Sequence, residues 1–156
     1  MGKKDGKTTV DPPAEHWRDE PAAHDYPAAA SFLSLVCPPA EVTRLVAALK
    51  AAPIERRLAK DLLRASSLSL LPADNTHVAA DLAKVAKGTA LSPVLLVQGD
   101  LRRGIPLTIA DGYHRVCASY HLNENAPIPC HLAVSGGVRS REPARSRSSR
   151  GPTAVQ

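Results

Sequence analysis

Five consecutive residues, Asp-Gly-Tyr-His-Arg at positions 111–115, have the composition of an anion-binding turn. An apolar stretch precedes them and a helical pattern follows, so they lie at a predicted strand-to-helix junction. Glycine there lets the backbone approach a ligand closely, and the first turn of a helix offers unpaired N–H groups. His114 and Arg115 add two basic side chains at the same place. The pattern predicts a nucleotide or another phosphorylated ligand, without identifying a reaction.

Arg115 is the first candidate for binding phosphate, because a guanidinium at a helix start can donate two hydrogen bonds to it. The alternative is an ion pair with Glu124 or Asp111. His114 is a second candidate phosphate donor, or a proton carrier near neutral pH. Its alternative is an exposed histidine in the first helical turn.

Asp111 has two interpretations that the sequence leaves open. An aspartate just before a helix commonly caps it by accepting backbone N–H bonds. The same carboxylate could bind Mg²⁺ beside phosphates, or accept a proton from a hydroxyl group. Asp111 is therefore the candidate catalytic residue, and the turn needs the backbone freedom of Gly112 under either interpretation.

The elements that must position this turn follow from the spacing of apolar residues. Helices are predicted at 28–36, 40–52, 77–87 and 113–122, and strands at 92–98, 107–110 and 128–133. Residues 59–63 fit either a helical turn or a short strand. After residue 70 the order is helix, strand, strand, helix, strand, which predicts a small α+β domain.

Composition divides the 156 residues into one domain and two tails. Residues 1–24 and the Arg/Ser-rich residues 136–156 are predicted to be disordered, and residues 25–135 form the domain. The net charge of +5 lies mostly in the second tail, where five arginines face one glutamate. Three cysteines without metal-type spacing fit reduced thiols in a bacterial-type cytosol, and no signal or membrane span is apparent. A cytoplasmic protein without a membrane partner is expected.

Over residues 77–133 the chain resembles the ParB/sulfiredoxin superfamily. The matching features are a helix followed by a proline and an apolar strand at 92–98, and a second strand that reaches a glycine-centred turn with a basic pair. A helix with a small residue, Ala118, and a proline-containing strand at 128–132 follow. The resemblance implies a short mixed sheet flanked by helices. It also implies a site for a nucleoside triphosphate or related phosphates, with Mg²⁺, at Gly112, His114 and Arg115.

Departures from the family pattern narrow what the resemblance implies. Sulfiredoxins carry their reactive cysteine where this chain has Tyr113, and Cys117 lies a full helical turn away, so sulfinate reduction is not expected. ParB partition proteins bind CTP at a related turn but continue into a helix-turn-helix and a dimerisation region. This chain continues into a tail, so a partition clamp is not expected either. Free-serine kinases and ParB-like nucleases use an acidic residue beside the glycine, which Asp111 matches.

The resemblance also implies a cation on the preceding helix, directed at the phosphates. His77 and Lys84 are the candidates, and Asp81 lies on the same helical stripe. The alternative is a solvated face on which Asp81 pairs with Lys84, a contribution of only about 0.2–0.5 kcal/mol.

No metal site is predicted, although His114, Cys117 and His121 share a helical face and Cys130 and His131 follow. Free cysteines are usually buried, so these thiols are expected in the core.

The leading hypothesis is a nucleotide-binding or phosphate-binding domain, with phosphoryl transfer or phosphodiester hydrolysis if it is an enzyme. The alternative is a non-catalytic nucleic-acid-binding or regulatory module attached through its C-terminal arginines. A purely structural domain, whose thermal stability no ligand would change, is a third hypothesis.

Overall fold

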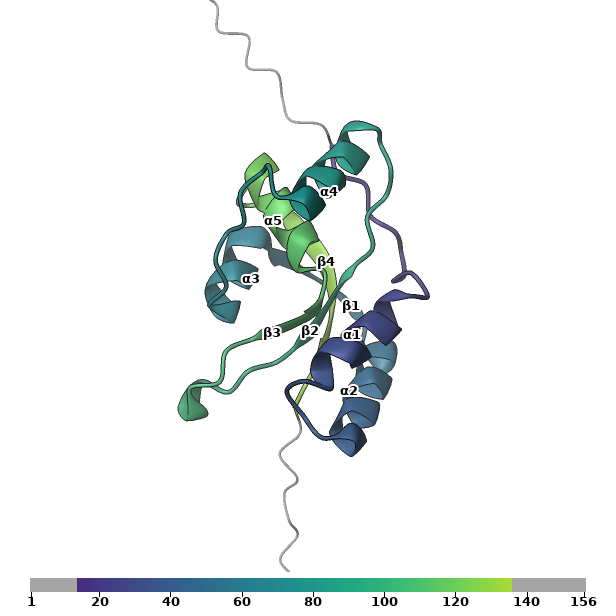
Figure 1. Cartoon of the computed structure of the whole chain (residues 1–156), viewed down its shortest axis with the longest axis vertical. Helices are drawn as coiled ribbons and strands as arrows, with labels where there is room; N and C mark the ends of the chain where they lie inside the picture. Colours follow the sequence, from purple (N-terminus) through teal and green to yellow (C-terminus); the bar gives the residue numbers. More distant parts are fainter. Residues whose placement is uncertain (1–13, 136–156) are drawn as a thin grey trace, which may run out of the picture.

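A four-stranded mixed sheet lies between two groups of helices in the computed structural model, which describes residues 14–135 (Figure 1). Its strands are β1 (Ile54–Leu58), β2 (Val94–Val97), β3 (Thr108–Asp111) and β4 (Pro127–Ala133). Their spatial order is β1-β4-β2-β3, with β2 and β4 parallel and the other two pairs antiparallel. The predicted α+β class, with a short mixed sheet flanked by helices, is confirmed.

Two helices cover one face of the sheet and three cover the other. The first pair is α1 (Asp25–Leu33) and α2 (Pro39–Ala51), and the second group is α3 (Ala59–Ser66), α4 (Thr76–Ala86) and α5 (Tyr113–Leu122). A short 3₁₀ helix, η1 (Leu101–Arg103), lies between β2 and β3.

The central strand β2 is buried on both faces, which explains its uninterrupted apolar sequence. Val94 and Leu96 face the core beneath α3, α4 and α5. Leu95 and Val97 face the smaller core beneath α1 and α2. Because β2 is held from both sides, it gives the neighbouring β3 a rigid partner, and the candidate turn follows directly from β3.

The order predicted after residue 70 is correct, and the helix predicted at 113–122 has the bounds of α5. Residues 59–63, left open between helix and strand, are helical in α3. The strand β1 was missed because Ile54-Glu-Arg-Arg-Leu58 places three charged residues between two apolar ones. Backbone pairing with β4 forms this edge strand, and burial contributes little.

The described part of the N-terminal segment does not match the disordered tail that was predicted over residues 1–24. From residue 14 onward the segment lies against the domain, and Trp17 forms a β-bridge with Leu91. The Ser119 hydroxyl donates to the Glu15 carboxylate at 3.0 Å, so the segment also contacts α5. The disorder predicted for residues 14–24 is therefore wrong, whereas residues 1–13 and the tail at 136–156 lie outside the described residues. Within 14–135, no helix combines the length and apolarity that crossing a membrane requires.

Candidate functional site

The candidate turn joins the end of β3 to the start of α5 through a single left-handed residue. Gly112 has φ of +104° and occupies the N-cap position of α5. A Cβ atom there would lie 2.9 Å from Nη2 of Arg115 and 3.0 Å from Cγ2 of Val94. Gly112 is thus required both by its backbone conformation and by the space its neighbours leave, as the sequence predicted.

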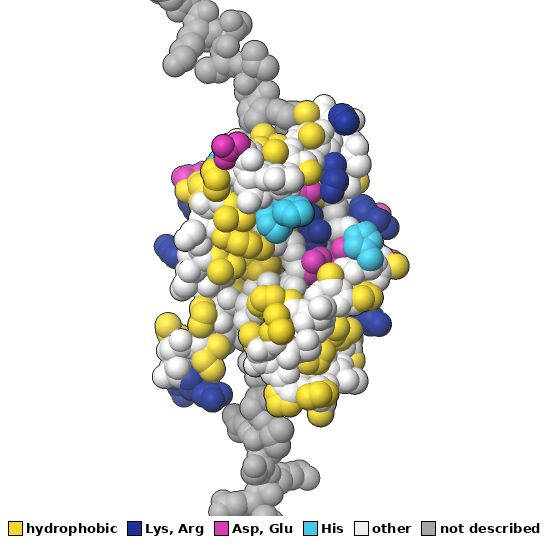
Figure 2. Space-filling model, in the orientation of Figure 1, with side chains coloured by type: hydrophobic (Ala, Val, Ile, Leu, Met, Phe, Trp, Pro, Cys, Tyr) yellow, Lys and Arg dark blue, Asp and Glu magenta, His cyan; other side chains and the backbone are white. Residues whose placement is uncertain are grey.

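All six candidate site residues line one small cavity between α4 and the start of α5. Its volume is about 160 Å³, and it is lined by His77, Ala80, Asp81, Lys84, Asp111, Gly112, His114 and Arg115. The rings of His77 and His114 lie 4.7 Å apart, centroid to centroid, across it. In Figure 2 histidine and basic side chains gather around a hollow on this face. The fold therefore brings the two separate sequence motifs, on α4 and at the turn, into one site.

The Arg115 guanidinium is engaged in an ion-pair network beneath this cavity. Its Nη2 donates to Oδ2 of Asp111 at 2.9 Å and lies 4.0 Å from Oδ2 of Asp25. Its Nε is buried and has no hydrogen-bond partner among the described residues. The side chain is only 15 % exposed. The ion pair with Asp111 that the sequence offered as an alternative is thus present, and Glu124 instead accepts from the Tyr120 hydroxyl.

Asp111 does not cap α5. The N-cap residue is Gly112, no side chain of the described residues caps the helix, and the Asp111 carboxylate accepts from Arg115. Burial raises the pKa of Asp111 above its ordinary value, against the opposing effect of Arg115. The capping interpretation is therefore wrong, and the N–H groups of the first turn of α5 lack a side-chain acceptor within the described residues.

Asp25 is the site residue that sequence reasoning missed. Its side chain is 2 % exposed, and its Oδ2 accepts from the backbone N–H of Ala22 at 3.0 Å. His24 Nε2 lies 3.2 Å from its other oxygen. In the sequence, Asp25 resembles an ordinary acidic residue of a first helical turn. Only the packing of α1 against β3 brings this second carboxylate to Arg115.

His114 is the titratable donor most affected by its surroundings. Burial is the largest effect that lowers the pKa of His114, and the neighbouring His77 and Arg115 lower this pKa further. The Asp81 carboxylate acts in the opposite direction and raises it. Lys84 Nζ in turn lies 3.0 Å from Oδ1 of the buried Asp81. Lys84 and Arg115 thus each have a carboxylate partner, which compensates part of the positive charge that an anion entering the cavity would meet.

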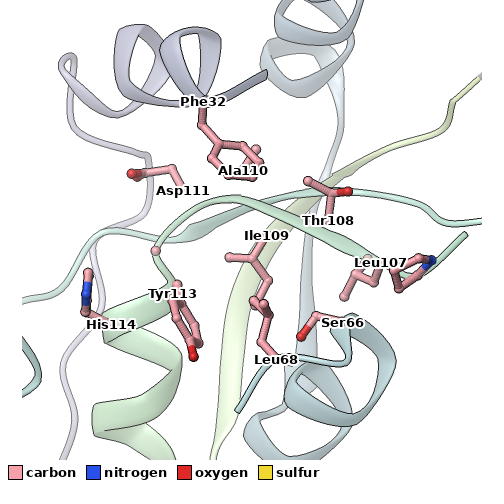
Figure 3. Close-up of a pocket in the computed structure, with 12 residues that line it drawn as sticks. Phe32, Ser66, Leu68, Leu107, Thr108, Ile109, Ala110, Asp111, Tyr113 and His114 are labelled. Carbon is pink, nitrogen blue, oxygen red and sulfur yellow. The ribbon is translucent and has the colours of Figure 1, made fainter. Parts of the chain in front are cut away.

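A larger apolar cavity adjoins the polar one and shares Asp111, Gly112 and His114 with it. Its volume is about 440 Å³. In Figure 3, Phe32 of α1 lies above the β3 backbone, and Leu68 and Tyr113 lie on the other side. The Tyr113 hydroxyl donates to the carbonyl oxygen of Ser69, which fixes that wall. The turn therefore separates a polar compartment from an apolar one.

The residues considered for a metal site do not form one. Cys117 and Cys130 are fully buried in the core, and burial raises the pKa of Cys130 to about 11. His121 Nε2 lies 2.7 Å from the Leu71 carbonyl oxygen, and His131 Nδ1 lies 2.8 Å from that of Ala52. Across residues 14–135, no group of three or more His, Cys, Asp or Glu side chains could hold a metal ion.

The chain has no match among protein-family models, curated proteins or solved structures. Its resemblance to the ParB/sulfiredoxin superfamily therefore stays a prediction.

Proposed function

We propose that this protein is a ParB/sulfiredoxin-like domain that binds a nucleotide, or another phosphorylated ligand, at the turn formed by residues 111–115. The observation that supports this proposal is the pair of compartments meeting at Gly112. A ligand with a charged end and a flat apolar end fits such a pair, and a nucleotide has both. The polar cavity would take phosphate, and the cavity beside Phe32 and Leu68 would take the base.

Phosphate in the polar cavity would meet donors from two helices. The first-turn N–H groups of α5 and its positive helix end favour an anion, and His114 adds a side-chain donor. From α4, His77 and Lys84 face the same space. The Lys84 side chain is 52 % exposed, so its ammonium group is accessible to a ligand as well as to Asp81.

Mg²⁺ suits this cavity because Asp81 and Asp111 place carboxylate oxygens beside the proposed phosphate position. A bound Mg²⁺ would neutralise phosphate charge that the paired cations leave uncompensated. If the protein is an enzyme, the site suits phosphoryl transfer or phosphodiester hydrolysis, with Asp111 as metal ligand or base. Asp111 accepts from Arg115 through Oδ2, so its other oxygen is the one available for either role.

Replacing Lys84 with alanine should weaken nucleotide binding about tenfold, because one charge-assisted hydrogen bond is lost. The His77→Ala variant should behave similarly. The His77→Ala variant should keep a thermal stability near the wild-type value because the His77 side chain is exposed. Lys84→Ala removes the lysine that pairs with the buried Asp81 carboxylate, so it should also lower thermal stability. Calorimetric titration of ATP, CTP and GTP, each with and without Mg²⁺, measures the effect. Equal affinities in wild type and Lys84→Ala, or no binding of any nucleotide, would overturn the proposal.

The control for this experiment is Lys87→Ala. Lys87 is exposed at the C-cap of the same helix but does not line the cavity. The substitution removes the same charge from α4 without removing a proposed ligand, so nucleotide affinity should change little.

Sulfate binding should strengthen about tenfold as the pH falls from about 8 to about 5.5. His114 has a lowered pKa and is neutral at pH 7, and a dianion nearby favours its charged form. Asp111, with its raised pKa, loses negative charge in the same direction. Sulfate keeps its own charge over this range, so the protein alone supplies the pH dependence. Calorimetry at several pH values measures it, and a His114→Gln variant with an unchanged profile would contradict the prediction.

A further inference from the structure

The connection between β2 and β3 forms an arm that projects from the domain, away from the candidate site (Figure 1). Its tip is the 3₁₀ helix η1, Leu101–Arg103, whose three residues are all exposed. Leu101 is 97 % exposed, more than any other large apolar side chain among the described residues. The arm presents this leucine directly beside two arginines, and nothing in the proposed nucleotide site requires it.

The arm is braced by hydrogen bonds within itself. Asp100 and Ile105 exchange backbone hydrogen bonds of 2.8 and 2.9 Å across its base. The Asp100 carboxylate accepts from the backbone N–H groups of Arg102 and Arg103 at 3.0 and 3.4 Å. Gly99 packs so closely that a Cβ atom would lie 2.3 Å from the Ile105 carbonyl oxygen. The exposed Leu101 is therefore carried by a hydrogen-bonded tip and not by an unbraced loop.

The charges at the tip indicate what it contacts. The one carboxylate of the arm, Asp100, is turned toward the backbone, and neither Arg102 nor Arg103 has an ion-pair partner within residues 14–135. Figure 2 shows the resulting basic cluster at the end of the arm. Arg64 of α3 and Leu101 line opposite sides of an open groove of about 550 Å³ between the arm and the domain. The partner should therefore carry repeated negative charge and accept an apolar wedge.

We propose that this arm binds the minor groove of duplex DNA. Leu101 would insert between base pairs, and Arg102 and Arg103 would contact phosphates beside it. A hairpin-like arm with an apolar side chain beside two arginines at its tip suits the minor groove, where inserted apolar side chains unstack and bend the duplex. Arginine contacts with phosphate supply binding that does not depend on sequence and weakens with salt.

Fluorescence anisotropy with a labelled duplex of random sequence tests this proposal on the full chain. The double variant Arg102→Gln/Arg103→Gln should bind more weakly, and the slope of log affinity against log salt should fall by about 1.8. The matched control is Arg56→Gln/Arg57→Gln, which removes two exposed arginines from the edge strand β1. This control should retain the wild-type slope.

Leu101→Ser tests the wedge separately from the charge. Energy transfer between dyes at the two ends of the duplex should show a smaller bend with this variant, while the salt slope stays unchanged. Three results would overturn the proposal: no DNA binding by the full chain, an equal loss in the β1 control, or binding abolished only by deleting residues 136–156. None of these results bears on the nucleotide titrations, because Leu101, Arg102 and Arg103 line neither the polar nor the apolar cavity.

Discussion

Replacing Arg115 with methionine is expected to lower the free energy of unfolding by about 3–5 kcal/mol. The guanidinium lies between the carboxylates of Asp111 and Asp25, at 2.9 Å and 4.0 Å. Without it, the mostly buried Asp111 carboxylate and the almost completely buried Asp25 carboxylate have no arginine or lysine of the described residues in contact, and Asp25 keeps only the exposed His24 ring beside its other oxygen. The cost of an uncompensated buried charge exceeds the small gain from an added apolar side chain.

The loss should depend on pH in a defined direction. Burial already raises the pKa of Asp111 against the effect of Arg115, so the pKa should rise further when the guanidinium is removed. Between the unfolded carboxyl value of about 3.9 and this raised folded value, the folded state binds the extra proton. Stability must then fall as the pH increases through that window. Denaturant unfolding should accordingly place the variant closer to wild type at about pH 4 than at about pH 7.

A second ion pair of the same chemistry supplies the control. Arg64 pairs with Asp61 at 3.1 Å on α3, but its side chain is 85 % exposed, so Arg64→Met should cost less than about 0.5 kcal/mol. Adding Asp25→Asn and Asp111→Asn to Arg115→Met should recover part of the lost stability, because the unpaired charges are removed. A small effect of Arg115→Met, equal to that of Arg64→Met, would show that the network does not stabilise the fold.

Gly112→Ala is expected to cost about 2–4 kcal/mol. A left-handed φ of +104° penalises any residue with a Cβ by about 1–2 kcal/mol. The added atom would also meet both methyl groups of Val94, at 3.0 and 3.1 Å, and Nη2 of Arg115 at 2.9 Å. Val94 is completely buried in the central strand and cannot move away freely. Thermal unfolding followed by circular dichroism measures the loss.

Gly88→Ala separates the two contributions expected at Gly112, the conformational penalty and the crowding by neighbouring atoms. Gly88 has φ of +72° at the end of α4, but no atom lies within 4 Å of the position of its missing Cβ. Its substitution should therefore cost only the conformational part, about 1 kcal/mol. Equal losses in the two variants would mean that crowding at the candidate turn contributes nothing.

These two expectations determine how the proposed function should be tested. Arg115 and Gly112 stabilise the fold as well as line the cavity, so their variants lose ligand binding for two reasons at once. His77 projects from the exposed face of α4 and can be replaced without disturbing the core, whereas replacing Lys84 leaves the buried Asp81 carboxylate without its lysine. His77 is therefore the cleaner probe of phosphate binding, even though the turn is the more prominent motif in the sequence.

Much of the fold could be predicted because local patterns and local interactions agree after residue 70. The apolar spacing in α4 and α5 and the continuous apolar run of β2 each depend on contacts within or next to the element. The strand β1 lacked such a pattern, since an edge strand is formed by hydrogen bonds to a partner far along the chain. The described part of the N-terminal segment was missed for the same reason, because its contacts are with Leu91 and Ser119.

The sequence by itself determined the α+β class, the strand-to-helix turn and the need for glycine at position 112. These follow from backbone geometry and from patterns of a few residues. Only the tertiary structure decided which charged side chains pair with one another at the turn. In the folded chain the Asp111 carboxylate pairs with Arg115 and does not cap the helix, and the Asp25 carboxylate of α1 lies near the same guanidinium. Ion pairing acts through distance in space and through burial, and neither quantity can be read from residue spacing along the chain.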